Sequence, residues 1–183
     1  MRAVPIALAV VLSSLSAFGQ RFGAAENLAP YIPTPQILVE RMLEAGHVKP
    51  GDIVYDLGSG DGRIVITAAQ KFGAKAVGVE IRADLCRIAT EKIRSLGLDE
   101  RVRMVQGDAL RVDLSPADVV TLYLLTSSNE LVKPNLEKYL KPGARVVSNQ
   151  FPIKGWRPVE TVHMTTGSAM QHTIFVYEIG RTK

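Results

Sequence analysis

The stretch YDLGSGDGRIVI, residues 55–66, decides the fold. An apolar run leads into glycines at positions 58, 60 and 62, and apolar residues at helical spacing follow them. A strand, a glycine-rich turn and a helix in direct succession are typical of a nucleotide-binding α/β unit. Asp56 comes just before the glycines, so we expect a carboxylate at the carboxyl end of this strand.

Strand-like and helical patterns alternate along the rest of the chain. Alternation of this kind predicts a parallel sheet covered by helices on both faces. Thr34 is the expected cap of a first helix, with Pro35 at its first position, and a kink or break is expected before Pro134. The runs RPVETVHMTT and QHTIFVYEIG predict a C-terminal antiparallel hairpin.

Composition favours one globular domain. Of the 183 residues, 46 % are hydrophobic and 22 % are charged. The net charge is +4, but the basic residues are spread along the chain without forming a run, so the charge does not argue for nucleic acid as a partner. The one cysteine, Cys86, stands at helical spacing and is expected to pack against a helix. The three histidines are far apart in sequence, so no metal site is expected.

The N-terminus looks like a targeting segment. A charged start, an apolar run from Ala3 to about Leu15 and the small-x-small pattern at 17–19 indicate a secretory signal over residues 1–19. An uncleaved anchor and an extension without a role are the alternatives. A linker over 20–30 and one domain over 31–183 follow. We expect export or membrane association through the leader, and a cytosolic location if the leader is not functional.

Three acids indicate which nucleotide the turn accepts. Glu80 closes the next predicted strand, where an acid accepts hydrogen bonds from both ribose hydroxyls, and Asp108 follows the third strand. A dinucleotide fits poorly, because the third glycine comes one position early and Asp56 would face phosphate oxygens. S-adenosylmethionine has no phosphate, and its ammonium would pair with Asp56. We therefore expect this cofactor, with its adenine bound by Asp108 and the amide of Ala109.

Each marker also has a plainer interpretation. The glycines alone are compatible with an ordinary strand-to-helix turn, and Asp108 is compatible with a helix cap or a turn acid. All three acids, however, follow successive parallel strands, at the edge where open α/β sheets bind ligands. That coincidence favours the cofactor interpretation.

The motifs DLGSGDGR, VGVEI and GDA resemble those of class I, seven-strand methyltransferases. The motifs YIPTP, VTLYLLTSSNE, LKPGARVVS, GW and HTIFVYEIG resemble the archaeal broad-specificity protein lysine methyltransferases. They are also similar to the mitochondrial lysine methyltransferases of the ATP synthase c-subunit and the adenine nucleotide translocase. The resemblance covers about residues 31–180. It implies an α/β fold: a doubly wound, mostly parallel, seven-strand Rossmann-like sheet with a C-terminal antiparallel hairpin.

The resemblance also implies site residues, carried over by position. Candidates for cofactor binding are Tyr31, Thr34, Asp56, Gly58, Ser59, Gly60, Glu80, Asp108 and Ala109. Candidates for the methyl-acceptor side are Tyr123, Thr126, Asn129, Asn149 and Trp156, and no catalytic residue is assigned. The YIPTP segment is interpreted as a lid, or as a plain helix entry. The alternative for Tyr123 is that it is a core aromatic residue, and the alternative for Trp156 is that it is a packing anchor.

The expected function is methyl transfer from S-adenosylmethionine to lysine side chains of a protein substrate. In one interpretation, that protein substrate is membrane-associated. The alternatives are a small-molecule methyltransferase and a non-catalytic module that binds a partner. Nucleobase amino-methyltransferases carry (D/N)-P-P-(Y/F/W) after the fourth strand, whereas this chain has YLLT. No nucleic-acid partner and no metal are therefore expected.

Overall fold

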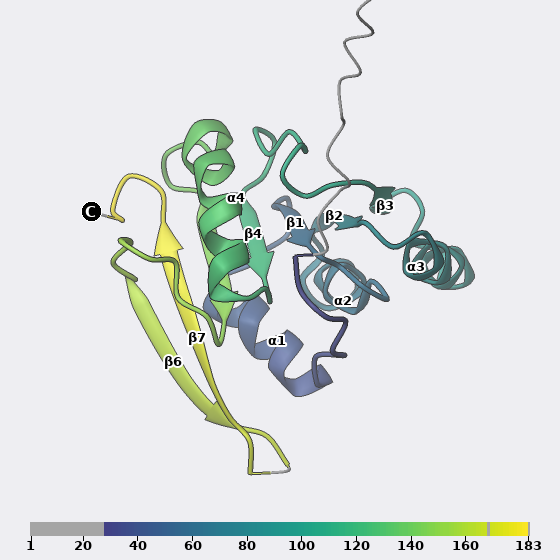
Figure 1. Cartoon of the computed structure of the whole chain (residues 1–183). Coiled ribbons are helices and arrows are strands. Elements are labelled where there is room, and N and C mark those ends of the chain that lie inside the picture. Colours follow the sequence, from purple (N-terminus) through teal and green to yellow (C-terminus); the bar gives the residue numbers. More distant parts are fainter. Residues whose placement is uncertain (1–27, 168, 183) are drawn as a thin grey trace, which may run out of the picture.

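The computed structural model describes residues 28–167 and 169–182 (Figure 1). The predicted leader over 1–19 and most of the linker over 20–30 lie outside these residues. Seven strands form one sheet in the order β3-β2-β1-β4-β5-β7-β6. The strands are β1 (Ile53–Leu57), β2 (Lys75–Glu80), β3 (Val102–Gln106), β4 (Val119–Leu122), β5 (Arg145–Asn149), β6 (Glu160–Thr165) and β7 (Gln171–Glu178).

The first five strands run parallel, and β7 is antiparallel to both β5 and β6. This arrangement confirms the predicted mostly parallel sheet with its C-terminal hairpin. The helices are α1 (Gln36–Ala45), α2 (Arg63–Phe72), α3 (Ala83–Ser95) and α4 (Thr126–Tyr139). None of the helices within residues 28–167 and 169–182 combines the length and the apolar character needed to cross a membrane.

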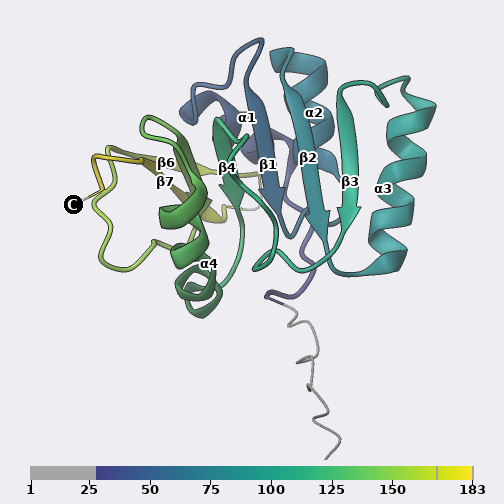
Figure 2. The same ribbon diagram turned by 90° about the horizontal axis from the view of Figure 1, so that it is seen from above.

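Two apolar cores lie on the two faces of the sheet. Side chains of α1, α2 and α3 pack on one face, around Leu38, Ile64 and Ile93. On the other face α4 packs through Val132 and Leu136, together with the loops that precede β4 and follow β5. Figure 2 shows these layers from above, with α4 on the opposite side of the sheet from α1 and α2. Burial on both faces explains why most residues of the central strands β1 and β4 are apolar.

The predicted cap of α1 is wrong, and of the kink or break predicted before Pro134 the break is absent. Thr34 does not cap α1: the cap position is Pro35, whose carbonyl accepts the amides of Leu38 and Val39 at 2.9 and 3.0 Å, and no side-chain cap bond forms. Thr34 is instead buried one residue earlier, with its carbonyl bonded to a side chain of α2. The helix α4 continues as one element through Pro134, so it does not break there.

The strand order places a crevice next to β1. The chain passes from β1 to β2 on one side and returns to β4 on the other, so the connections diverge at the carboxyl end of β1. Open parallel sheets bind ligands at such a switch point. Asp56, the fourth residue of β1, therefore lies where a ligand is expected.

Candidate cofactor site

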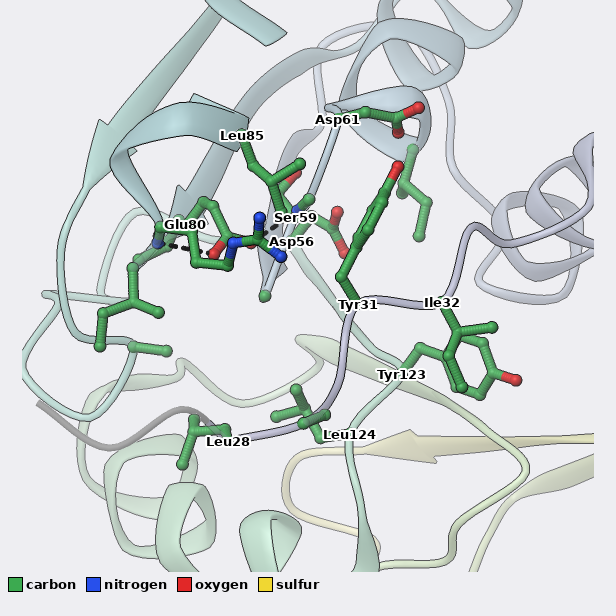
Figure 3. Close-up of a pocket in the computed structure, with 18 of the residues that line it drawn as sticks. Leu28, Tyr31, Ile32, Asp56, Ser59, Asp61, Glu80, Leu85, Tyr123 and Leu124 are labelled. Atoms are coloured by element: carbon green, nitrogen blue, oxygen red, sulfur yellow. Dashed lines mark hydrogen bonds between the residues drawn. The ribbon is translucent and has the colours of Figure 1, made fainter. Parts of the chain in front are cut away.

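A cavity opens at the carboxyl ends of β1, β2 and β4 (Figure 3). Its wall consists of the entry segment before α1, the glycine turn after β1, the end of β2 with the start of α3, and the loops after β3 and β4. The lining residues are Leu28 to Thr34, Asp56, Gly58 to Asp61, Arg63, Ile64, Val79 to Arg82, Leu85, Gly107, Ala109, Tyr123 and Leu124.

The glycine turn is tied to the end of β2 by Glu80. The amide of Gly60 donates to Oε2 of Glu80 at 2.8 Å, and the amide of Arg82 donates to Oε1 at 2.8 Å. Glu80 is only 7 % exposed. Each carboxylate oxygen has a second lone pair, so both can still accept a bond from a ligand hydroxyl.

Gly78 allows the turn to lie this close to the sheet. A Cβ atom built on Gly78 would approach Sδ of Met104 at 2.5 Å and Oγ of Ser59 at 2.6 Å. Side chains do not make contacts that short, so Gly78 is required by close packing of the turn over β2. The same turn contains Gly60, with φ of 55°, where the left-handed backbone also favours glycine.

Asp56 is a buried carboxylate at the bottom of the cavity. Its Oδ1 accepts a hydrogen bond from Oγ1 of Thr121 at 2.7 Å. The pKa of Asp56 is raised to about 6, mainly by burial and also by the nearby acids Glu80 and Asp61, against the lowering effect of the Thr121 and Ser59 hydroxyls. Oγ of Ser59 is itself buried and makes no hydrogen bond of regular geometry. The cavity floor thus combines a carboxylate with an unsatisfied hydroxyl.

The entry segment is held over the glycine turn by Arg63. Its guanidinium makes two bonds to the Asp61 carboxylate, at 2.8 and 2.6 Å, and a third to the Thr34 carbonyl at 2.6 Å. Although burial opposes it, this pairing lowers the pKa of Asp61 below its ordinary value. The ring of Tyr31 lies against Gly60, because a Cβ on that glycine would approach Cε2 of Tyr31 at 2.7 Å. Residues 31–34 therefore cover part of the cavity, as a lid would.

The structure brings most of the candidate cofactor residues to this cavity. Eight of the nine line it: Tyr31, Thr34, Asp56, Gly58, Ser59, Gly60, Glu80 and Ala109. Asp108 is not among the lining residues, and its Oδ1 accepts the amide of Leu110 at 2.9 Å, which is the turn-acid arrangement. The neighbours of Asp108, Gly107 and Ala109, form the wall instead.

Among the acceptor-side candidates, only Tyr123 lines the cavity. Thr126 is the exposed first residue of α4. Asn129 is fully buried and donates to the carbonyl of Phe151 at 2.9 Å, joining α4 to the loop after β5. Asn149 is buried at the end of β5, and both polar atoms of its amide lack a partner among the described residues.

Trp156 is a packing residue in this structure. Its ring meets Tyr177 edge to face, with centroids 5.5 Å apart, and its Nε1 donates to Oε1 of Glu137 at 3.0 Å. It lies in the core on the α4 face of the sheet and is not part of the cavity wall. The packing-anchor interpretation therefore describes its position.

Sequence reasoning missed several cavity residues. Ile81 and Leu85 form an apolar wall beside Glu80, and Arg63 fixes the lid. Ile81 was visible in principle, because an apolar residue directly follows the acid that ends β2. Leu85 and Arg63 gave no local signal, since their roles depend on how α3 and the entry segment pack.

These residues fit S-adenosylmethionine. Asp56 would hold the ammonium, Glu80 the ribose hydroxyls, and Ile81 and Leu85 would flank the adenine. The buried Oγ of Ser59, without a partner, is the kind of polar atom that a bound ligand satisfies. Within the described parts of the chain, no three His, Cys, Asp or Glu side chains are grouped so that they could hold a metal ion.

Comparison with known proteins agrees with this geometry. A solved structure described as an RNA methyltransferase from Salinibacter ruber in complex with S-adenosyl-L-homocysteine is 44 % identical, with a TM-score of 0.76, over 81 % of this chain and 94 % of that one. The fold and the cavity define an S-adenosylmethionine-dependent methyltransferase of the seven-strand class. More narrowly, the model of the ANTKMT methyltransferase domain matches residues 56–160, and the chain belongs to this family.

Two relatives are also similar. A protein-lysine N-methyltransferase from Saccharolobus islandicus is 52 % identical over 155 residues, which are 84 % of this chain and 96 % of that protein. The adenine nucleotide translocase lysine N-methyltransferase of Mus musculus is 36 % identical over 133 residues. That match covers 73 % of this chain and 58 % of the mouse protein, so the chain spans little more than half of its length.

Proposed function

We propose that the protein transfers methyl groups from S-adenosylmethionine to the side-chain amines of lysine residues in proteins. The observation that carries the proposal is the 52 % identity, over almost the whole archaeal relative, to a protein-lysine N-methyltransferase. The cavity supports it, because the carboxylates of Asp56 and Glu80 lie where the ammonium and ribose of the cofactor are expected.

The mouth of the cavity suits the methylene chain of a lysine. Tyr31, Ile32, Tyr123 and Leu124 are among the residues that line the cavity (Figure 3). Tyr31 and Ile32 are 40 % and 59 % exposed, which leaves apolar surface available at the rim. An apolar slot of this kind removes water from an amine that enters it, and desolvation favours the neutral form of an amine.

When bound, S-adenosylmethionine supplies an electrophilic methyl group on a sulfonium. A neutral lysine nitrogen forms the new bond to the methyl carbon while the carbon–sulfur pair stays on sulfur, so no covalent enzyme intermediate is needed. The contribution of this chain is alignment and exclusion of water. No histidine lines the described cavity, and its acids are bonded at the cofactor end. The lysine proton is therefore lost to water.

A transfer assay tests the proposal. The purified protein and labelled S-adenosylmethionine are incubated with a lysine-containing protein, with the same protein carrying arginine in place of lysine, with RNA, and with small amines. Label in the lysine protein alone supports the proposal. Equal label in the arginine control refutes lysine as the acceptor. Label in RNA would favour the activity for which the Salinibacter ruber protein is described.

The pH dependence of the reaction provides a second test. A free lysine has a pKa near ~10.4, so the neutral fraction rises about tenfold per pH unit around neutrality. We expect the rate at saturating cofactor to follow that rise between pH 6 and 9 and then to level off. A bell-shaped profile with an optimum near pH 7 would reveal an enzyme acid and base.

We also infer that residues 1–19 direct the protein to export or to a membrane, and that its protein substrate is membrane-associated. The charged start, the apolar run and the small-x-small pattern support the first part. Leu28 lines the cavity and follows the end of the leader by nine positions in the sequence, so a membrane-held leader would keep the cavity near the membrane surface. Cell fractionation with intact-mass analysis tests this inference. A full-length product found only in the cytosol would refute it.

A further inference from the structure

Asp56 and Thr121 form a buried pair across two neighbouring strands. The parallel register of β1 and β4 places the two residues opposite each other, with both side chains on the same face of the sheet. Thr121 is fully buried and Asp56 is 3 % exposed. The hydroxyl has one hydrogen, and Oδ1 of Asp56 at 2.7 Å is a far better acceptor than the Tyr55 carbonyl at 3.4 Å.

The surroundings of Asp56 oppose its negative charge. The titratable groups that face it are Glu80 at the end of β2 and Asp61 in the glycine turn, and both are acids. Two arginines line the cavity, and each is paired with another acid: Arg63 with Asp61 and Arg82 with Asp84, through two hydrogen bonds each. The Thr121 hydroxyl therefore supplies the regular hydrogen bond that favours the ionised form of Asp56.

We propose that Thr121 is a positioning residue for cofactor binding: it holds Oδ1 of Asp56 and leaves Oδ2, ionised, for the ammonium of S-adenosylmethionine. The inference rests on the cofactor of the proposed function and extends it to a residue that does not line the cavity. It explains why a hydroxyl is fully buried in a central strand whose other residues, Val119, Val120 and Leu122, are all apolar.

A consequence for the pH dependence of binding follows. The ammonium pairs with the carboxylate form, so affinity falls about tenfold per pH unit once the pH is below the pKa of Asp56. Burial already raises that pKa to about 6. Removal of the Thr121 hydroxyl would raise it further, and the midpoint of the affinity curve would move to higher pH.

The test is calorimetric binding from pH 5 to 7.5, with two ligands and three proteins. Thr121→Val keeps the shape of the side chain without the hydroxyl, and Thr121→Ser restores the hydroxyl. For S-adenosylmethionine, we expect the Val variant to show a midpoint about one pH unit higher and about fivefold weaker binding at pH 6. The Ser variant should follow the wild-type curve. Methylthioadenosine, which lacks the ammonium, should bind all three proteins alike.

The outcomes separate this inference from the proposed function. A Val variant with the wild-type midpoint overturns the role of Thr121 and leaves the cofactor assignment intact. An equal loss for methylthioadenosine also overturns it, because the effect would then be a general distortion of the site. A wild-type protein that binds no S-adenosylmethionine overturns both. Thermal unfolding establishes that each variant is folded, and Thr121→Ala replaces Thr121→Val if the latter is not.

Discussion

Replacement of Glu80 by alanine tests the central geometry of the site. The carboxylate of Glu80 accepts the amides of Gly60 and Arg82, each at 2.8 Å, and it is almost fully buried. These two bonds join the glycine turn and the start of α3 to the end of β2. Without the carboxylate, two backbone amides lose their partners, and so do the ribose hydroxyls of the cofactor under the proposed assignment.

The expected effect is large. A hydrogen bond to a charged group contributes about 1.5–3 kcal/mol net, so the loss of two lowers the free energy of unfolding by at least about 3 kcal/mol. For a domain of this size, about 1 kcal/mol corresponds to roughly 2–4 °C in Tm, so we expect a fall of roughly 6–12 °C. Affinity for S-adenosylmethionine should fall about ten- to a hundredfold through the lost ribose contacts.

Calorimetry separates the two effects. Unfolding is followed without ligand and with saturating S-adenosylmethionine, and binding is titrated on the folded variant at low temperature. Glu91→Ala is the matched control, because Glu91 lies on the exposed face of α3 in a surface pair with Arg87, and such pairs contribute about 0–1 kcal/mol. An unchanged Tm for Glu80→Ala would refute the stabilising role of the two hydrogen bonds that Glu80 accepts from the Gly60 and Arg82 amides. An unchanged affinity for S-adenosylmethionine would refute the assignment of Glu80 to the ribose hydroxyls.

Three further changes have definite expectations. Gly78→Ala would press a methyl group against Met104 and displace the glycine turn, so cofactor affinity should fall and stability should drop by about 1–3 kcal/mol, as titration calorimetry and urea unfolding would show. Asp56→Asn should stabilise the ligand-free protein. The folded pKa of Asp56 is raised from 3.8 to about 6, so its protonated form contributes stability below pH 4 that is lost as the pH rises through 6. The gain of the Asn variant should thus reach up to about 3 kcal/mol at pH 7.5 and vanish near pH 4 in urea unfolding, while cofactor binding is lost. Arg63→Ala frees the Thr34 carbonyl, so S-adenosylhomocysteine should dissociate faster, by about tenfold or more in stopped-flow measurements, if the lid slows release.

The sequence predicted the architecture because its signals are local. Each strand is a short apolar run, each helix has its own periodicity, and the turn at 58–62 carries glycines where the backbone is left-handed. The carboxylates of Asp56 and Glu80 could be placed for the same reason: each is one of the last two residues of its strand, and the carboxyl ends of parallel strands meet at one edge.

The remaining site features depend on packing between distant segments. The lid contact of Arg63 joins α2 to residues 29 positions earlier, and Thr121 meets Asp56 across 65 positions. Neither pattern is visible in a local window. Trp156 and Asn129 were candidates for the acceptor side through the family resemblance, but both side chains make contacts that hold α4 to the loop after β5.

The position of β7 affects how the protein is made. This strand follows β6 in the sequence, yet it lies between β5 and β6 rather than at an edge. During synthesis, β5 therefore keeps an unpaired edge until residues 171–178 have been made, and such edges can pair with other chains. A stop codon before residue 171 would delete this interior strand, leaving β5 paired with β4 alone and β6 without a partner strand. Messages truncated before β7 should consequently yield aggregated protein rather than a slightly shortened enzyme.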